Sequence, residues 1–129
     1  MTAPVRVLIV DDEKPISTLL AQAFTQEGYR VENASDGIEC MNRMAAFEPD
    51  VVVMDIMMPR LDGVDTTRLI RRNRNYAGAI IVALSARSDD ETRQRMKEAG
   101  ANLFMRKPFV IAKLVERVAR MLATRSGSR

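Results

Sequence analysis

Histidine is absent from this chain of 129 residues, and cysteine occurs only once. Without histidine, serine–histidine and cysteine–histidine catalysis are excluded, together with most zinc sites. The lone Cys40 cannot form an internal disulfide, and its helix-like surroundings predict a buried small hydrophobic side chain. Any chemistry must therefore rest on carboxylates, hydroxyls and lysine.

Long apolar runs are also missing. The longest, such as residues 79–84, are far shorter than the ~18–20 residues that a membrane-spanning helix needs. The first residues, MTAP, lead into a strand-like segment without the basic start or apolar stretch of a secretory signal. We therefore expect a cytoplasmic protein that does not interact with membranes.

Charge of one sign is not concentrated anywhere. Twenty Lys and Arg against 17 Asp and Glu give a net charge of +3, and the basic residues are scattered. This pattern is typical of solvated helix faces, so direct nucleic-acid binding is not expected. With 47% hydrophobic and 29% charged residues, the composition is that of one ordinary globular domain.

Five strand-like segments recur along the chain. Four are runs of β-branched and aliphatic residues that predict strands buried on both faces, at residues 6–10, 50–54, 79–84 and 102–105. Residues 29–34 instead alternate apolar and polar side chains, which favours an edge strand with one wetter side.

Helical patterns lie between the strands, and the first shows an apolar stripe of Ile16, Leu19, Leu20, Ala23 and Phe24. The last helix is marked by Leu114, Val115, Val118, Met121 and Leu122. The third and fourth helices are predicted at about residues 63–73 and 89–99.

Helix-boundary signals agree with this pattern. Gly28 and Gly100 are placed as helix-ending glycines, and Asp36 and Asp62 as caps of the second and third helices. The Ser-x-x-Glu sequence that begins at Ser88 matches a capping box for the fourth helix.

Strict alternation of strands and helices implies right-handed crossovers and a parallel sheet covered by helices on both faces. The predicted fold class is α/β, an open, doubly wound (βα)5 three-layer sandwich. In such sheets ligands bind at the carboxyl ends of the strands, near the point where the strand order reverses.

Five polar residues follow strand ends in this arrangement. Asp11 and Asp12 come after the first strand, Asp55 after the third, Ser85 after the fourth and Lys107 after the fifth. Alone, each has an ordinary explanation as a helix cap, a turn residue or a surface charge. Their coincidence at four strand ends predicts one functional site at that edge of the sheet.

Three carboxylates in one cleft repel each other by up to several kcal/mol at an effective dielectric constant near ~20. A bound cation would relieve this, and Mg²⁺ prefers carboxylate, phosphate and water oxygens. Asp55 would then be placed as a nucleophile toward an activated phosphoryl group. Lys107 and Ser85 would stabilise the phosphoryl oxygens.

At these positions the chain resembles the receiver domain of two-component response regulators. The matching stretches are VLIVDDE (7–13), VMDIMMP (53–59) followed by Asp62 and Gly63, ALSA (83–86) and KPF (107–109). The resemblance covers about residues 5–122. It implies a flavodoxin-like, five-stranded parallel sheet in the order 2-1-3-4-5.

The resemblance also implies roles for individual residues. Asp12 and Asp55 would bind Mg²⁺, or Mn²⁺ in its place, directly, and Asp11 would bind it through water. The backbone carbonyl of Met57 would be a further metal ligand. Asp55 would be phosphorylated and Lys107 would bridge to the phosphoryl group, with a cis peptide bond between Lys107 and Pro108.

The same resemblance implies a conformational switch. Phosphorylation would draw the Ser85 hydroxyl and the Ala86 amide inward, and Phe104 would turn into the space behind Ser85. Because Phe104 lacks a tyrosine hydroxyl, switching would depend more on packing. Met57 and Arg87 are expected to hinder the hydrolytic water, so the phosphorylated state should not be especially short-lived.

Partners also follow from the resemblance. A sensor histidine kinase or a histidine phosphotransfer protein would donate the phosphoryl group. The fourth helix, fifth strand and fifth helix would contact a downstream effector. The sequence does not decide whether the chain forms a homodimer. Only self-phosphorylation and autodephosphorylation are expected, so the chain would not be an enzyme in the usual sense.

Domain boundaries are predicted at 1–122 for the receiver domain and 123–129 for a flexible C-terminal tail. The domain would act alone or be part of a longer regulator, and the composition of the tail does not separate these two options.

Three other functions fit the sequence less well. A phosphatase of the haloacid-dehalogenase type needs Asp-x-Asp after the first strand, but Glu13 stands two places after Asp11. In a flavin-binding module, Asp11, Asp12 and Glu13 would repel the flavin phosphate. A phosphate-independent binding domain would have no need of Asp55, Ser85 and Lys107 together.

Overall fold

The structure is a computed structural model that describes residues 3–58, 60–87 and 89–127. Within these residues strands and helices alternate. The strands are β1 Arg6–Val10, β2 Arg30–Ala34, β3 Val51–Asp55, β4 Ile80–Ser85 and β5 Leu103–Arg106. The helices are α1 Lys14–Gln26, α2 Gly37–Phe47, α3 Gly63–Arg72, α4 Asp90–Ala99 and α5 Ile111–Gly127, with a 3₁₀ turn, η1 Arg74–Tyr76, before β4.

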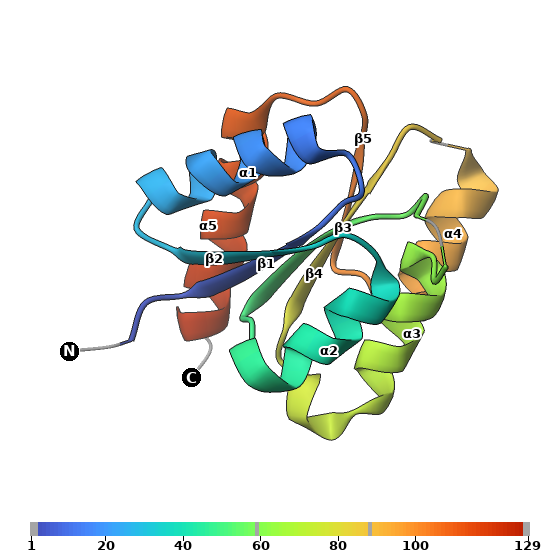
Figure 1. Ribbon diagram of the computed structural model, residues 1–129, viewed down its shortest axis with the longest axis horizontal. Coiled ribbons are helices and arrows are strands. Elements are labelled where there is room, and N and C mark those ends of the chain that lie inside the picture. Colours follow the sequence, from blue (N-terminus) through green and yellow to red (C-terminus); the bar gives the residue numbers. More distant parts are fainter. Residues whose placement is uncertain (1–2, 59, 88, 128–129) are drawn as a thin grey trace.

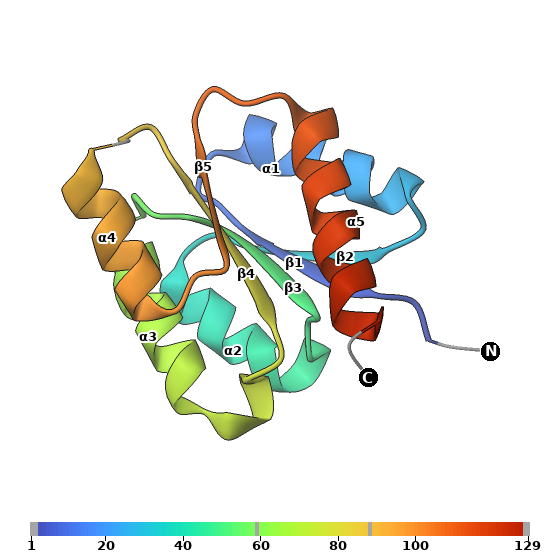
Figure 2. The same ribbon diagram turned by 180° about the vertical axis from the view of Figure 1, so that it is seen from behind.

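These strands form one parallel sheet in the order β2-β1-β3-β4-β5. Helices α1 and α5 cover one face of the sheet, and α2, α3 and α4 cover the other (Figures 1 and 2). Right-handed crossovers explain this division, because the strand order reverses between β1 and β3. The predicted doubly wound sandwich and its strand order are confirmed. Among the described residues, no helix has both the length and the apolar character needed to cross a membrane.

The core lies on both faces of the central strands β1, β3 and β4, which bury almost every side chain. Alternate residues of a strand point to opposite faces, so each strand contributes to two cores. Ile9 and Val53 pack with Phe24 of α1 and Leu114 of α5. The other face packs against α2 and α3, with Cys40 buried there as predicted. Each fully buried aliphatic side chain contributes about 1.5–3 kcal/mol to the stability of the fold. A strand that is covered on both faces can bury such a side chain at every position, which is why these strands are continuous apolar runs.

Strand boundaries differ slightly from prediction. Strands β3, β4 and β5 begin and end one residue later than expected. Asp55 and Ser85 are therefore the last residues of their strands, and Lys107 follows β5 directly. Each residue is thus held by the sheet or directly beside it, rather than in a free loop.

Two predictions of burial are wrong. The fifth strand is an edge strand whose residues Leu103, Phe104 and Met105 are only partly buried, because no strand covers its outer side. Leu19, assigned to the core-facing stripe of α1, is 53% exposed. The apolar stripe of α1 is wider than the part of the helix that contacts the sheet, so Leu19 lies at its margin beside Pro108.

Aspartates begin three of the helices. As predicted, Asp36 and Asp62 cap α2 and α3, each accepting a hydrogen bond from the amide three residues later. Ser88, the predicted cap of α4, lies outside the described residues. The N-cap of α4 is Asp89, which accepts a bond from the amide of Thr92.

Gly100 ends α4 in the left-handed region, with φ +114°, as its predicted role requires. A Cβ at this position would lie 2.6 Å from Cγ of Arg71, so close packing as well as φ demands glycine. The guanidinium of Arg71 donates to the carbonyl of Gly100 and to Oδ1 of Asn102. Arg71 thereby ties α3 to the end of α4 and the start of β5.

The C-terminal segment is helical for longer than predicted. A flexible tail was expected from residue 123, yet α5 continues to Gly127. Arg125 explains the extension, because its guanidinium donates to the Gly78 carbonyl at 2.6 Å and lies 3.6 Å from the carboxylate of Asp50. Residues 128 and 129 lie outside the described part of the chain.

Candidate functional site

The sheet brings the predicted site residues to one rim. Val10 pairs with Met54, Asp55 with Leu84, and Ser85 with Arg106, so the carboxyl ends of β1, β3, β4 and β5 are aligned. The site residues lie at these ends or just beyond them: Asp11, Asp12, Asp55, Ser85 and Lys107. The register of a parallel sheet thus decides which polar residues meet.

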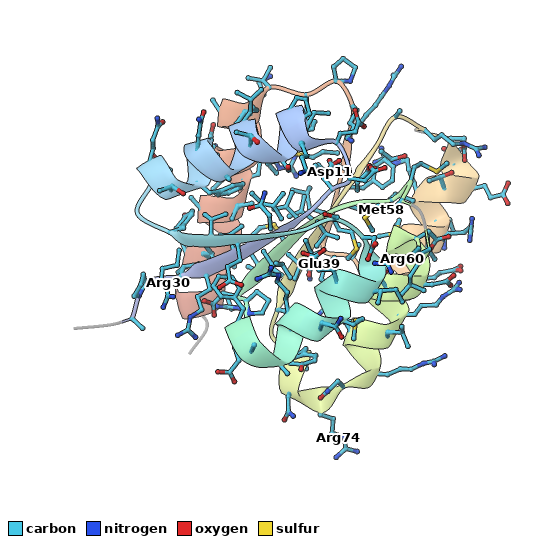
Figure 3. All side chains as sticks on the ribbon, in the orientation of Figure 1. Asp11, Arg30, Glu39, Met58, Arg60 and Arg74 are labelled. Atoms are coloured by element: carbon cyan, nitrogen blue, oxygen red, sulfur yellow. The ribbon has the colours of Figure 1, made fainter. Side chains whose placement is uncertain are left out.

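Four acidic side chains gather at this rim. Asp11, Asp12, Glu13 and Asp55 each offer a carboxylate oxygen, and these oxygens lie within 4.8 Å of one another. Asp11 and Asp55 are almost completely buried, whereas Asp12 and Glu13 are exposed. Figure 3 shows Asp11 where β1 runs into α1.

Hydrogen bonds from backbone amides hold the two buried carboxylates in place. Oδ1 of Asp11 accepts a bond from the amide of Glu13 at 2.8 Å, and Oδ1 of Asp55 accepts one from the amide of Met57 at 3.2 Å. Each carboxylate keeps its second oxygen for another partner. For both carboxylates that partner is the ammonium of Lys107.

Lys107 reaches the acidic group from the end of β5. Its Nζ lies 3.3 Å from Oδ2 of Asp11, 3.5 Å from Oδ2 of Asp55 and 3.5 Å from Oε1 of Glu13. The amide of Lys107 donates to the Ser85 carbonyl at 2.7 Å, and its bond to Pro108 is cis, as predicted. The backbone therefore directs the ammonium to the carboxylates.

Burial dominates the electrostatics of the rim. It raises the pKa of Asp55 to about 6, with Lys107 acting in the opposite direction and Asp11 adding to the rise. Burial also raises the pKa of Asp11. Burial alone would lower the pKa of Lys107, but Asp55 and Asp11 outweigh it, and the pKa is raised. The positive charge of Lys107 is therefore too small to offset the burial of the two carboxylates.

The acidic group has the chemistry of a site for a hard divalent cation. Its ligand atoms are carboxylate oxygens, which Mg²⁺ prefers, and four acidic groups face one ammonium. Asp11, Asp12 and Asp55 were predicted as metal ligands. Glu13 was not, although it is the next residue in the chain. The sequence signal was its place after the Asp pair, but only the turn into α1 shows that Glu13 faces Lys107.

The predicted phosphate-binding and switch residues occupy the neighbouring strands. Ser85 is completely buried, and its hydroxyl accepts a bond from the amide of Arg87 at 3.0 Å. Ala86 follows it and is exposed. Phe104 is partly buried on β5, and the guanidinium of Arg93 on α4 lies 4.9 Å from the centre of its ring. The aromatic ring is thus held against α4.

The loop after β3 carries two further features. Met57 is 58% exposed, while its amide donates a hydrogen bond to Asp55. Arg60 forms an ion pair with Asp36, the cap of α2. Sequence reasoning assigned no role to Arg60, because nothing local links residues 24 positions apart.

Comparison with known proteins agrees with this geometry. The response regulator receiver domain family matches residues 7–119. Response regulator MprA from Mycobacterium sp. (strain KMS) is 38% identical over 119 residues, covering 92% of this chain and 51% of that protein. The chain thus spans about half the length of the curated relatives it matches.

Two solved structures are similar over nearly the whole chain. Chemotaxis protein CheY4 of Vibrio cholerae is 30% identical with a TM-score of 0.86, covering 92% of this chain and 98% of that one. The receiver domain of sensor histidine kinase PA1611 from Pseudomonas aeruginosa PAO1, with magnesium coordinated in its active site cleft, is 32% identical. Its TM-score is 0.83, covering 92% and 97%. This chain belongs to the response regulator receiver domain family of two-component signal transduction.

Proposed function

We propose that this receiver domain is a Mg²⁺-dependent phosphoacceptor that takes a phosphoryl group on Asp55 and thereby changes a surface that controls a partner protein. The observation that carries the proposal is the meeting of Asp55, Asp11 and Lys107 at one buried point of the rim. A purely structural role would not explain two buried carboxylates with raised pKa values beside a lysine.

Asp55 is the nucleophile in this proposal. One carboxylate oxygen forms a bond to phosphorus while the bond from phosphorus to the donor's imidazole nitrogen breaks. The electron pair of that bond stays on the nitrogen, and neutral imidazole is released because the other ring nitrogen keeps its proton. Lys107 balances the negative charge that the phosphoryl oxygens bring to the rim. With a pKa of about 6, the Asp55 carboxyl is mostly ionised at pH 7 and able to attack.

The acidic group holds the metal. Asp12 and Asp55 would hold Mg²⁺, or Mn²⁺ in its place, directly, Asp11 would hold it through water, and the Met57 carbonyl would be a further ligand. When bound, the ion would supply positive charge to the transferring phosphoryl oxygens. Support comes from the gathered carboxylate oxygens and from the magnesium in the PA1611 receiver domain.

The signal passes to α4 and β5 through Ser85 and Phe104. For Ser85 to donate to a phosphoryl oxygen, its hydroxyl turns toward Asp55, with the Ala86 amide as a second donor. Phe104 then leaves its contact with Arg93 and packs behind Ser85. The added dianion favours this arrangement, so phosphorylation shifts a two-state equilibrium. Met57 and Arg87 slow the hydrolytic water.

The partners are proteins. A sensor histidine kinase or histidine phosphotransfer protein donates the phosphoryl group at the rim, where an apolar groove lined by Ile16, Leu19, Pro108 and Phe109 lies beside Lys107. An effector reads the α4-β5-α5 surface, which also serves a homodimer if one forms. The chain catalyses only its own phosphorylation and dephosphorylation, so it is not an enzyme acting on a separate substrate.

Incubation with acetyl phosphate and Mg²⁺, followed by intact mass measurement, tests the proposal. We expect one added phosphoryl group in the native chain and none in Asp55→Asn. Asp90→Asn, an exposed aspartate at the start of α4, is the matched control and should be labelled like the native chain. Equal labelling of Asp55→Asn would reject the site, and labelling that persists in excess EDTA would reject the metal requirement.

A further inference from the structure

Arg60 connects the loop after β3 to the start of α2. Its Nε lies 2.7 Å and its Nη2 2.5 Å from the same carboxylate oxygen, Oδ2 of Asp36. Figure 3 shows Arg60 beside the first turn of α2, near the end of the sheet where Met58 lies. A guanidinium that meets an oxygen through two nitrogens is a directional contact as well as a charge pair.

Asp36 is a firm anchor for this contact. Its Oδ1 caps α2 by accepting the amide of Glu39 at 2.9 Å, and its side chain is only 9% exposed. The two oxygens therefore have separate tasks, one toward the helix and one toward Arg60. The capping bond and the ion pair both lower the pKa of Asp36, so the carboxylate stays charged.

The loop is pressed against α2 at the same place. Arg60 has φ +67°, a left-handed conformation that costs free energy for a residue with a side chain and persists where surrounding contacts hold it. A Cβ on Gly37 would lie 2.6 Å from the carbonyl oxygen of Leu61. The ion pair is thus part of a tight contact between the loop and the first turn of α2.

The other part of this loop belongs to the phosphoacceptor site. Asp55 ends β3, and the amide of Met57 donates to Oδ1 of Asp55. Ile56 accepts a bond from the amide of Gly63, where α3 begins. Backbone hydrogen bonds therefore hold both ends of the loop, near Met57 and at Gly63. Arg60 lies between these ends and adds a contact to a different element, α2.

We propose that Arg60 is a positioning residue, whose ion pair with Asp36 holds the loop so that the Met57 backbone and the Asp55 carboxylate are arranged for the divalent cation. The cation's role rests on the function proposed above. Arg60 touches neither the cation nor the phosphoryl group. It acts through the loop, as groups that orient metal ligands do in other sites.

A double-mutant cycle tests this positioning role. Arg60→Gly removes the guanidinium and tolerates the positive φ, and Asp36→Asn keeps a capping side chain while removing the charge. We expect each single variant to raise the Kd for Mg²⁺, measured by calorimetry, by about tenfold. The double variant should be no weaker than either single variant, because both remove the same contact. Arg60→Lys should restore part of the affinity.

Hydrogen exchange of the metal-free protein gives a second readout. The amides of Met57 and Met58 should exchange several-fold faster in Arg60→Gly, while the amides of β1 and β3 are unchanged. Arg43→Ala is the matched control, because it also removes an arginine with its ion pairs, to Glu32 and Glu39, and neither pair involves the loop after β3. It should alter neither exchange in the loop nor Mg²⁺ affinity.

Additive effects of Arg60→Gly and Asp36→Asn, or native loop exchange in Arg60→Gly, would overturn the positioning role. These results differ from a failure of the proposed function. If the native chain neither bound Mg²⁺ nor took up phosphate, the function would be wrong, and exchange in metal-free protein would still decide whether Arg60 holds the loop.

Discussion

At the scale of single residues, the rim is governed by a shortage of positive charge. Asp11 and Asp55 are buried, and Lys107 is the cation that contacts both. The two carboxylates lose hydration on burial, and the attraction of the Lys107 ammonium does not fully offset this loss. The pKa values of Asp11 and Asp55 are therefore both raised. Without a further cation, these ionised carboxylates therefore give the protein a lower free energy of unfolding than neutral side chains at the same positions would.

Asp55→Asn should stabilise the metal-free protein at neutral pH. The Asp55 pKa is about 6 in the folded state and about 3.9 in the unfolded chain, so between these values the folded state binds more protons. The native chain's free energy of unfolding then falls as pH rises from about 4 to about 6. We expect Asp55→Asn to gain about 1–2 kcal/mol at pH 7, after allowing for solvent screening.

Urea unfolding in EDTA at several pH values measures this effect. The difference between the two proteins should be smallest at about pH 3 and below, where Asp55 is mostly protonated in both states. It should reach its full size above about pH 6. A destabilised Asp55→Asn protein at pH 7 would contradict the charge shortage inferred for the rim.

Lys107→Ala should separate phosphorylation from response. Asp55 and the acidic group remain, so the variant should still take up phosphate from acetyl phosphate and Mg²⁺. Without the ammonium, the phosphorylated and free states differ less in their contacts. Phosphorylation-induced changes in the backbone NMR shifts of α4 and β5 should therefore shrink. Shift changes equal to those of the native chain would exclude a signalling role for Lys107.

At the scale of elements, α4 is anchored differently at its two ends. At its C-terminal end, Arg71 binds the Gly100 carbonyl and Asn102, whose Oδ1 also accepts the amide of Ile81 in β4. At its N-terminal end, Asp89 contacts its near neighbours Arg87 and Thr92. The first turns of α4 also contact β5 through Arg93 and the Phe104 ring. The proposed switch would break that contact, so we expect movement at this end, next to Ser85, rather than at the end held by Arg71.

Gly100→Ala tests the anchored end. The left-handed φ and the 2.6 Å approach to Arg71 both oppose a side chain. We expect a loss of about 1–3 kcal/mol in the free energy of unfolding, measured with urea. Gly28→Ala is the matched control, because Gly28 also has a positive φ, +91°, but its added Cβ meets nothing within 4 Å. If both substitutions cost the same, the packing against Arg71 is not important.

At the scale of the whole molecule, a ligand that binds only the folded state couples the rim to global stability. We expect Mg²⁺ to raise the free energy of unfolding by about 2.7 kcal/mol when its concentration is 100 times the Kd. Thermal unfolding with increasing MgCl₂ measures this, with NaCl of equal ionic strength as the control. EDTA should reverse the effect, and an equal rise with NaCl would refute specific binding.

Much of the fold followed from local signals. Continuous apolar runs identified β1, β3 and β4, because a strand covered on both faces needs apolar residues at every position. The same reasoning placed β5 correctly to within one residue but wrongly predicted burial on both faces, since a short apolar run is also compatible with an edge strand. The end of α5 was missed because Arg125 is held by Gly78, which is 47 positions away.

The sequence by itself determined the alternating α/β architecture and which polar residues lie at one edge of the sheet, because alternating strands and helices place all carboxyl ends of a parallel sheet at that edge. Asp11, Asp12, Asp55, Ser85 and Lys107 could therefore be named in advance. Only the tertiary structure decided the contacts of Glu13 with Lys107, Arg60 with Asp36 and Arg71 with Gly100. These contacts depend on the paths of loops and the directions of long side chains, which no local pattern encodes.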